Sequence, residues 1–130
     1  EPEKLVQRVS LFSDFPPDRL NHISRLLKPM LAVPDEIIIK KGEIGHAMYF
    51  ISSGCVEVEV QPEPVRLGSG EFFGEIALIK NNPRTSTVKA LGFCDLLVLS
   101  DSDFKLFLDD NPEIRQTLSE TADRRIEMDH

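Results

Sequence analysis

The chain has 130 residues, of which 41% are hydrophobic and 28% are charged. This length and composition predict one domain, residues 1–130, with one buried core, and the apolar runs are far shorter than the roughly 20 residues that cross a bilayer. The net charge of −7 repels phosphate backbones and anionic lipids, which argues against nucleic-acid binding and membrane insertion. A phosphate ligand would therefore need a local, specially built site.

The cysteines indicate a reducing compartment. Glu1 stands where an initiator Met would, and no basic and apolar leader follows it, so we expect no signal peptide here. Cys55 and Cys94 lie in strand-like runs without CxxC spacing, which favours two buried thiols over a disulfide or a zinc site. The three histidines are scattered, so no metal site is expected.

Helices are predicted in the first 29 residues. Residues 3–9 alternate charged and apolar side chains, which indicates a short helix. Asp14 followed by two prolines is typical of an N-cap and a first helical turn, so a second helix should run to about Lys28.

Short β-branched runs separated by glycine and proline fill residues 30–100. These runs are 37–40, 48–52, 56–60, 65–67, 85–91 and 96–99. Such regular spacing predicts an antiparallel sandwich, barrel or jelly roll. One interruption, residues 74–79, lacks β alternation and predicts a short helix inside the β region.

Two helices are predicted in residues 101–130. The oxygens of residues 100–103 should cap the first of these helices, and Asn111 and Pro112 should be the N-cap and first turn of the second. One narrow stripe of this last helix contains four residues, Ile114, Leu118, Thr121 and Arg125. An arginine therefore ends an otherwise inward-facing row.

The stretch 72–87 has the chemistry of an anion site. Gly74 lets the backbone come close to a ligand, and the short helix beginning there presents the unpaired N–H groups of Glu75, Ile76 and Ala77. These groups and the helix dipole would favour one phosphate charge.

Three side chains add to this site. Arg84 offers a planar fork that binds two phosphate oxygens at once, and the Thr85 hydroxyl can donate a further bond. Glu75 is misplaced beside an anion unless it accepts hydrogen bonds from a ribose hydroxyl, with Arg84 nearby helping to keep it ionised.

The segments FGEIAL at 73–78 and PRTSTV at 83–88 resemble the phosphate-binding cassette of the cyclic-nucleotide-binding domain family. The resemblance extends upstream along nearly the whole chain, to Pro34, Ile38, Gly42, Gly45, residues 49–51, Gly54 and residues 56–60. It implies an α+β, mainly β, fold: an antiparallel β-roll or jelly roll over residues 30–100 with the short phosphate-binding helix inside it, N-terminal helices over 1–29 and two C-terminal helices over 101–130. It implies cAMP or cGMP as the ligand and no other cofactor.

The resemblance also implies a role for each residue of the site. Gly74 and Glu75 would take the ribose and phosphate region, and Arg84 and Thr85 the cyclic phosphate. The full set of expected ligand-binding residues is Gly74, Glu75, Ile76, Ala77, Arg84, Thr85, Ser86, Val58, Arg125 and Arg124. Val58 would touch the base, and Arg125, with Arg124 as the second choice, would cap it from the last helix.

Two positions depart from the family pattern. Asp35 stands where glycine is usual, which should alter only a turn, and Ser86 replaces the usual alanine. Thr85 can reach a guanine amino group in members that bind cGMP, so the choice between cAMP and cGMP stays open.

The chain looks most like the domain of bacterial cyclic-nucleotide-regulated potassium channels. This implies a cytoplasmic sensor domain of a cell-membrane protein, in which nucleotide binding draws the final helix over the base and gates an attached channel or transporter. The isolated domain should be a monomer and the parent a homo-oligomer, a tetramer if it is a channel.

Other functions were weighed against this one. The same domain occurs in cAMP receptor-type transcription factors and in kinase regulatory subunits, but neither a DNA-reading helix-turn-helix nor a pseudosubstrate stretch is present in this sequence. A cupin-type metalloenzyme would need two histidines one residue apart, which the chain lacks. No nucleophile with an adjacent base is found, so we expect binding without catalysis.

Overall fold

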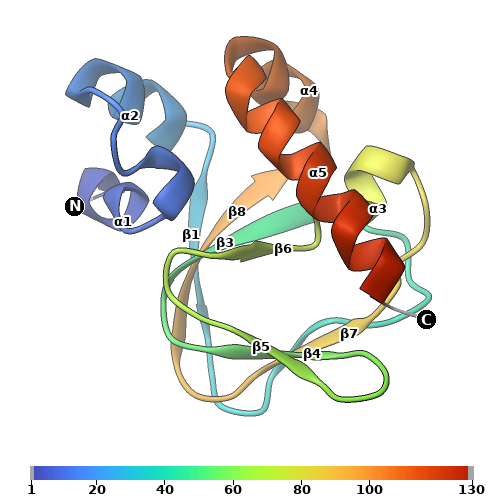
Figure 1. Ribbon diagram of the computed structural model, residues 1–130. Coiled ribbons are helices and arrows are strands. Elements are labelled where there is room, and N and C mark those ends of the chain that lie inside the picture. Colours follow the sequence, from blue (N-terminus) through green and yellow to red (C-terminus); the bar gives the residue numbers. More distant parts are fainter. Residues whose placement is uncertain (1, 129–130) are drawn as a thin grey trace.

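Two four-stranded antiparallel sheets face each other in the computed structural model, which describes residues 2–128 (Figure 1). The strands are β1 (Lys28–Ala32), β2 (Ile37–Ile39), β3 (Ala47–Ser53), β4 (Val56–Glu59), β5 (Val65–Leu67), β6 (Phe72–Phe73), β7 (Thr87–Ala90) and β8 (Cys94–Ser100). The helices are α1 (Pro2–Gln7), the 3-10 turn η1 (Ser10–Phe12), α2 (Pro17–Ser24), α3 (Glu75–Lys80), α4 (Asp101–Asp110) and α5 (Pro112–Met128). The strand orders are β1-β8-β3-β6 in the first sheet and β2-β7-β4-β5 in the second.

All six predicted runs form strands, and the short helix predicted between them is α3. The sequence did not predict β1 or β6. β1 contains Pro29 and pairs with β8 only, at the edge of the first sheet, where a missing N–H is tolerated. β6 has two residues, Phe72 and Phe73, which pair with Phe50 and Tyr49 of β3; it is too short for any alternation to be visible.

The buried side chains form two clusters rather than the single core that was expected. Ile51 and Leu96 belong to the cluster formed by residues of both sheets, whereas their chain neighbours Phe50 and Leu97 belong to the cluster that includes the helices. All four are at most 1% exposed. Because successive side chains of a strand point to opposite faces, β3 and β8 are buried on both sides and serve both clusters.

The second helix is shorter than predicted at both ends. α2 begins at Pro17, with Pro16 and not Asp14 at the N-cap position, and it ends at Ser24. It cannot continue to Lys28, because Lys28 already pairs with Val98 of β8.

Polar side chains at the starts of α4 and α5 have other partners than the predicted ones. The Ser100 hydroxyl contacts the side chains of Ser102 and Asp103 and makes no capping bond to the backbone of α4. Asn111 precedes α5, which begins at Pro112 as predicted, but its amide donates back to the Phe107 carbonyl at 2.8 Å. Its side-chain oxygen accepts two hydrogen bonds from Arg19 of α2, at 2.8 and 3.1 Å.

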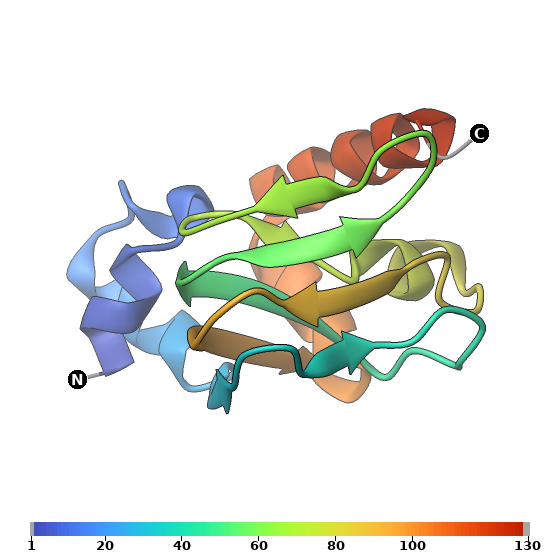
Figure 2. The same cartoon turned by 90° about the horizontal axis from the view of Figure 1, so that it is seen from below.

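Both cysteines are free, as predicted, but only Cys94 is fully buried, and Cys55 is half-buried. Among residues 2–128, no helix has the length and apolar character needed to span a membrane. The tip of the β4–β5 hairpin and the C-terminal end of α5 lie at the same end of the molecule (Figure 2). α5 packs against α3 and α4.

Candidate functional site

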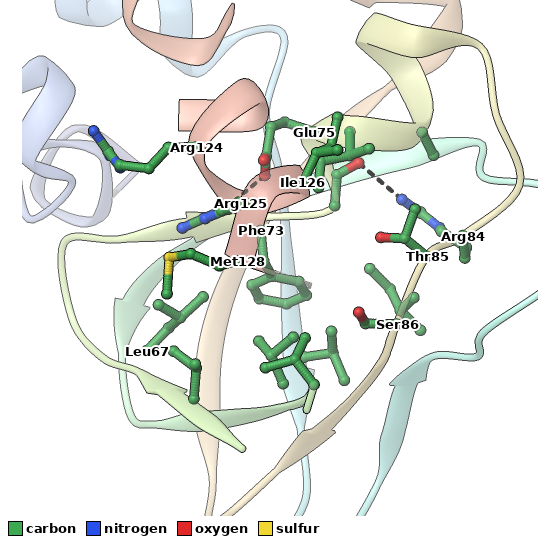
Figure 3. A pocket seen from close by; sticks show the side chains of 18 residues that line it. Leu67, Phe73, Glu75, Arg84, Thr85, Ser86, Arg124, Arg125, Ile126 and Met128 are labelled. Carbon is green, nitrogen blue, oxygen red and sulfur yellow. Dashed lines mark hydrogen bonds and ion pairs between the residues drawn. The ribbon is translucent and has the colours of Figure 1, made fainter. Parts of the chain in front are cut away.

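A pocket of about 320 Å³ lies where α3, α5, β7 and the β4–β5 hairpin meet (Figure 3). Its lining consists of Ile39, Val58, Val60, Val65, Leu67, Phe73, Gly74, Glu75, Ile76, Ala77, Arg84, Thr85, Ser86, Val88, Arg124, Arg125, Ile126 and Met128. Every one of the ten residues that the sequence predicted for the ligand site is in this set. The structure therefore brings together residues that are up to 67 positions apart in the chain.

Arg84 is fixed in place by backbone carbonyls. Its Nη1 donates to the Gly74 carbonyl at 2.8 Å and its Nη2 donates to the Ala47 carbonyl at 2.6 Å. A guanidinium has five N–H donors, so three remain without a hydrogen bond in the described part of the chain. Burial lowers the pKa of Arg84, but an arginine keeps its charge in proteins. The residue is thus a buried, preset cation with donors to spare.

Glu75 is the second buried charge of the pocket. It is 1% exposed, and its Oε1 accepts a hydrogen bond from Arg125 Nη1 at 2.7 Å. Its Oε2 is buried and finds no hydrogen-bond partner within residues 2–128. Burial raises the pKa of Glu75 above its ordinary value, against the attraction of Arg125 and, more weakly, of Arg84. Arg84 does lower the pKa of Glu75, in the direction expected, but the desolvation of the carboxyl outweighs the nearby positive charges.

Helix α5 lies over the pocket and is tied to α3 by two ion pairs. Arg125 reaches Glu75, and Lys80 reaches Asp123 at 2.9 Å. The guanidinium of Arg125 also lies over the Phe72 ring, 5.0 Å from its centroid. At this distance a cation–π attraction adds to the ion pair.

The predicted inward stripe of α5 is confirmed. Ile114, Leu118 and Thr121 are buried, and the side chain of Arg125 is 26% exposed. Arg124 is exposed, contacts Thr121 Oγ1 at 3.4 Å and points away from the pocket in Figure 3. The geometry therefore favours Arg125 over Arg124 as the arginine that faces a ligand.

Gly74 is also required by the backbone, apart from the predicted close approach to a ligand. It is the N-cap of α3 with a φ of +86°, which strains any side chain. A Cβ here would lie 3.0 Å from Arg84 Nη1. The position thus starts the helix and leaves room for the guanidinium.

The sequence reasoning missed most of the apolar half of the pocket. It named Val58 only, whereas Val65 pairs directly with Val58 across the β4–β5 hairpin and Leu67 pairs with Val56. Phe73 and Met128 complete this wall. Paired residues of an antiparallel ladder share a face, so the hairpin register was the signal that could have found Val65. Phe72 and Phe73 are both buried.

No group of three or more potential metal ligands occurs among the residues described.

Comparison with known proteins agrees with this geometry. Residues 32–111 match the family described as "Cyclic nucleotide-binding domain". The chain belongs to this family. The domain is 41% identical over 119 residues to a cyclic nucleotide-gated potassium channel of Rhizobium etli, a match that covers 92% of the domain and 34% of the channel.

A second relative is the potassium/sodium hyperpolarization-activated cyclic nucleotide-gated channel 2 of Mus musculus, with 34% identity over 125 residues, 95% of the domain and 14% of the channel. The domain thus spans about a third, or less, of the length of the curated relatives it matches.

Solved structures share the fold of the cyclic nucleotide-binding domain. The structure titled "cAMP bound PfPKA-R (141-441)" superposes with a TM-score of 0.80 and 29% identity, over 94% of the domain and 44% of that chain. The Thermus thermophilus catabolite activator protein superposes with a TM-score of 0.76 and 24% identity, over 91% of the domain and 58% of that chain. The predicted α+β fold with its antiparallel β-roll is confirmed.

Proposed function

We propose that the domain binds cAMP or cGMP in this pocket, with Arg84 on the cyclic phosphate and Glu75 on the ribose. One observation carries the proposal: Glu75, whose buried Oε2 has no partner within residues 2–128, and the buried Arg84, three of whose donors are free within the same residues, line one pocket. An unpaired buried acceptor costs free energy unless a ligand donates to it. A ribose 2′-hydroxyl is such a donor, and a phosphate is the acceptor that Arg84 lacks.

The phosphate would lie between Arg84 and the start of α3. Thr85 and Ser86 line the pocket next to Arg84 in sequence and offer hydroxyl groups. The N–H groups of the first turn of α3, including those of Ile76 and Ala77, are of the kind that a helix leaves unpaired. One negative charge is then met by one guanidinium and several neutral donors, with Gly74 shaping the backbone between them.

The base would lie against the apolar wall. Val58 and Val65 supply aliphatic contact from the hairpin, and Met128 and Arg125 supply contact from α5. A planar purine gains from burying its faces in such a wall. Both purines fit this description, so the ligand class is a cyclic purine nucleotide, with Thr85 as the residue that would sense the amino group of guanine.

The output that we propose is regulation of an attached ion channel or transporter. This rests on the identity of 34–41% to channels over more than 90% of the domain. The domain would then lie on the cytoplasmic side of a cell-membrane protein that assembles as a homo-oligomer, a tetramer if it is a channel. The groups that we place on the phosphate only donate hydrogen bonds to it. We therefore propose binding without hydrolysis and no further cofactor.

Calorimetric titration of the domain with cAMP and with cGMP tests the ligand class. Arg84→Leu should weaken binding by about 2–5 kcal/mol, because it leaves a desolvated phosphate without its cation. The control is Arg25→Leu, since Arg25 is exposed and lines no part of the pocket. No heat with either nucleotide, or an unchanged affinity of Arg84→Leu, would contradict the proposal.

The 2′-deoxy nucleotide tests the ribose contact. Glu75→Gln should lose much less affinity for the 2′-deoxy form than for the ribose form, because the hydroxyl that Glu75 accepts from is missing there. Equal losses for the two ligands would remove Glu75 from the ribose site.

A further inference from the structure

The loop between β2 and β3 holds Arg84 by its backbone. Gly42 N–H donates to the Arg84 carbonyl at 2.9 Å, and the Arg84 N–H donates to the Glu43 carbonyl at 2.8 Å. The next residue after the loop, Ala47, accepts from Arg84 Nη2. Residues 42–47 therefore contact both the main chain and the side chain of Arg84, although none of them lines the pocket.

Gly45, in the same loop, lies directly against the guanidinium. A Cβ at this position would lie 2.7 Å from Arg84 Cζ, 2.8 Å from Arg84 Nε and 2.9 Å from Ala77 Cβ. Carbon atoms in ordinary contact are about 3.5–4.0 Å apart, so at least one group would have to move. The φ of Gly45 is not positive, so its backbone does not itself require glycine. Space for Arg84 is what the position provides.

The guanidinium is the group that would yield to a Cβ. It is the far end of a flexible side chain, whereas Ala77 belongs to helix α3. Its movement would stretch or break the hydrogen bonds to the Gly74 and Ala47 carbonyls. The remaining contact with Ala77 Cβ, at 2.9 Å, would also require a small shift of the loop or of α3.

We propose that Gly45 is a positioning residue for Arg84: its missing side chain lets the guanidinium lie flat against the β2–β3 loop, in the orientation that presents the free donors to the ligand. This inference rests on the proposed function for its effect on binding, but the position of Arg84 itself can be measured without a ligand. Gly45 would touch no ligand atom and would act only through Arg84.

Gly45→Ala is the test, with Gly92→Ala as the matched control. Gly92 lies in the β7–β8 turn, its φ is not positive, and a Cβ there would meet nothing within 4 Å. In calorimetric titration with cAMP and cGMP, Gly45→Ala should bind roughly ten- to hundredfold more weakly, as expected for a misplaced binding group. Gly92→Ala should stay within about twofold of the unmodified domain.

NMR of the Arg84 Nε–Hε group tests the position directly, in the nucleotide-free domain. Gly45→Ala should shift this resonance and speed its hydrogen exchange, whereas Gly92→Ala should leave both unchanged. A general loss of stability would not move this one signal while leaving the rest of the spectrum in place. An unshifted Arg84 resonance in Gly45→Ala would overturn the proposal.

A double-mutant cycle in urea unfolding separates Arg84 from other neighbours of Gly45. Gly45→Ala should destabilise the domain less in the Arg84→Leu background, because the two closest atoms are then gone. The same penalty in both backgrounds would overturn the proposal. If Gly45→Ala does not fold, recovery of folding in Gly45→Ala/Arg84→Leu supports the proposal, and failure of the double variant to fold refutes it.

The two levels of inference fail differently. If the unmodified domain binds neither nucleotide, the proposed function falls, and the Arg84 resonance and the unfolding cycle still decide the role of Gly45. If it binds and Gly45→Ala binds equally well, only the role of Gly45 falls.

Discussion

Replacing Glu75 by glutamine should change how the stability of the nucleotide-free domain depends on pH. The carboxylate is 1% exposed, one of its oxygens has a single partner in Arg125, and the other has none among the described residues. Burial therefore raises its pKa above the ordinary value of 4.5. Glutamine has nearly the same shape but cannot ionise, so Glu75→Gln isolates the effect of this charge.

The sign of the effect follows from proton binding. Well below pH 4.5 the carboxyl is protonated in both states, and its contribution to stability is fully present. As the pH rises above 4.5, the unfolded chain loses the proton first, so the free energy of unfolding falls until the pH passes the raised pKa of the folded domain. One proton limits this fall to about 1.4 kcal/mol per pH unit. Glu75→Gln lacks it and should gain stability relative to the unmodified domain across this window.

Urea unfolding at half-unit steps from pH 4 to 8 measures the difference. Glu63→Gln is the control, because Glu63 is exposed and its curve should run parallel to that of the unmodified domain. Arg125→Ala should extend the fall to higher pH, since Arg125 is the strongest influence lowering the pKa of Glu75. A Glu75→Gln curve that runs parallel to the unmodified domain would refute the reasoning.

Three further predictions concern affinity and stability. Arg125→Ala should weaken nucleotide binding in calorimetry by less than Arg84→Leu does, because Arg125 is 26% exposed and water can replace it; a larger loss would contradict this. Phe107→Ala should lower the free energy of unfolding, measured by urea unfolding, by about 3–5 kcal/mol, since the ring is fully buried against Phe12. A loss below about 1 kcal/mol would contradict this estimate. Asp35→Gly should raise the free energy of unfolding by about 0.5–1 kcal/mol, because Asp35 has a φ of +69°, which glycine adopts more easily. A decrease would contradict the idea that the backbone is strained at this residue.

The site was predictable where its residues are close together in the chain. Residues 73–88 contain the short helix, Glu75 and Arg84, and their spacing alone indicated an anion site. The β4–β5 wall was harder, because Val65 reaches the pocket only through its register with Val58. Arg125 could be placed on the inward face of its helix by periodicity, but its pairing with Glu75 could not. That contact joins residues 50 positions apart and depends on how α5 crosses α3.

Local signals failed where tertiary partners took over polar groups. Asn111 has the sequence of an N-cap, yet Arg19 and the Phe107 carbonyl use its side chain. The second helix was overextended because Lys28 and its neighbours are recruited into the edge of the first sheet. The role of Gly42 and Gly45 around Arg84 was likewise invisible, since nothing in the sequence says that this loop packs against residue 84.

The contact of Arg19 with Asn111 and Glu113 holds the start of α5. Arg19 of α2 binds the residue before α5 and a residue of its first turn, so α2 is linked to the start of the last helix. Arg125 lies 11 residues beyond Ile114, about 17 Å along the axis at about 1.5 Å per residue. A tilt of about 10° at the root would thus displace the Arg125 end by about 3 Å, by simple leverage along a stiff rod. A small tilt of α5 at its start, next to α2, would therefore be accompanied by a larger displacement of Arg125 over the pocket.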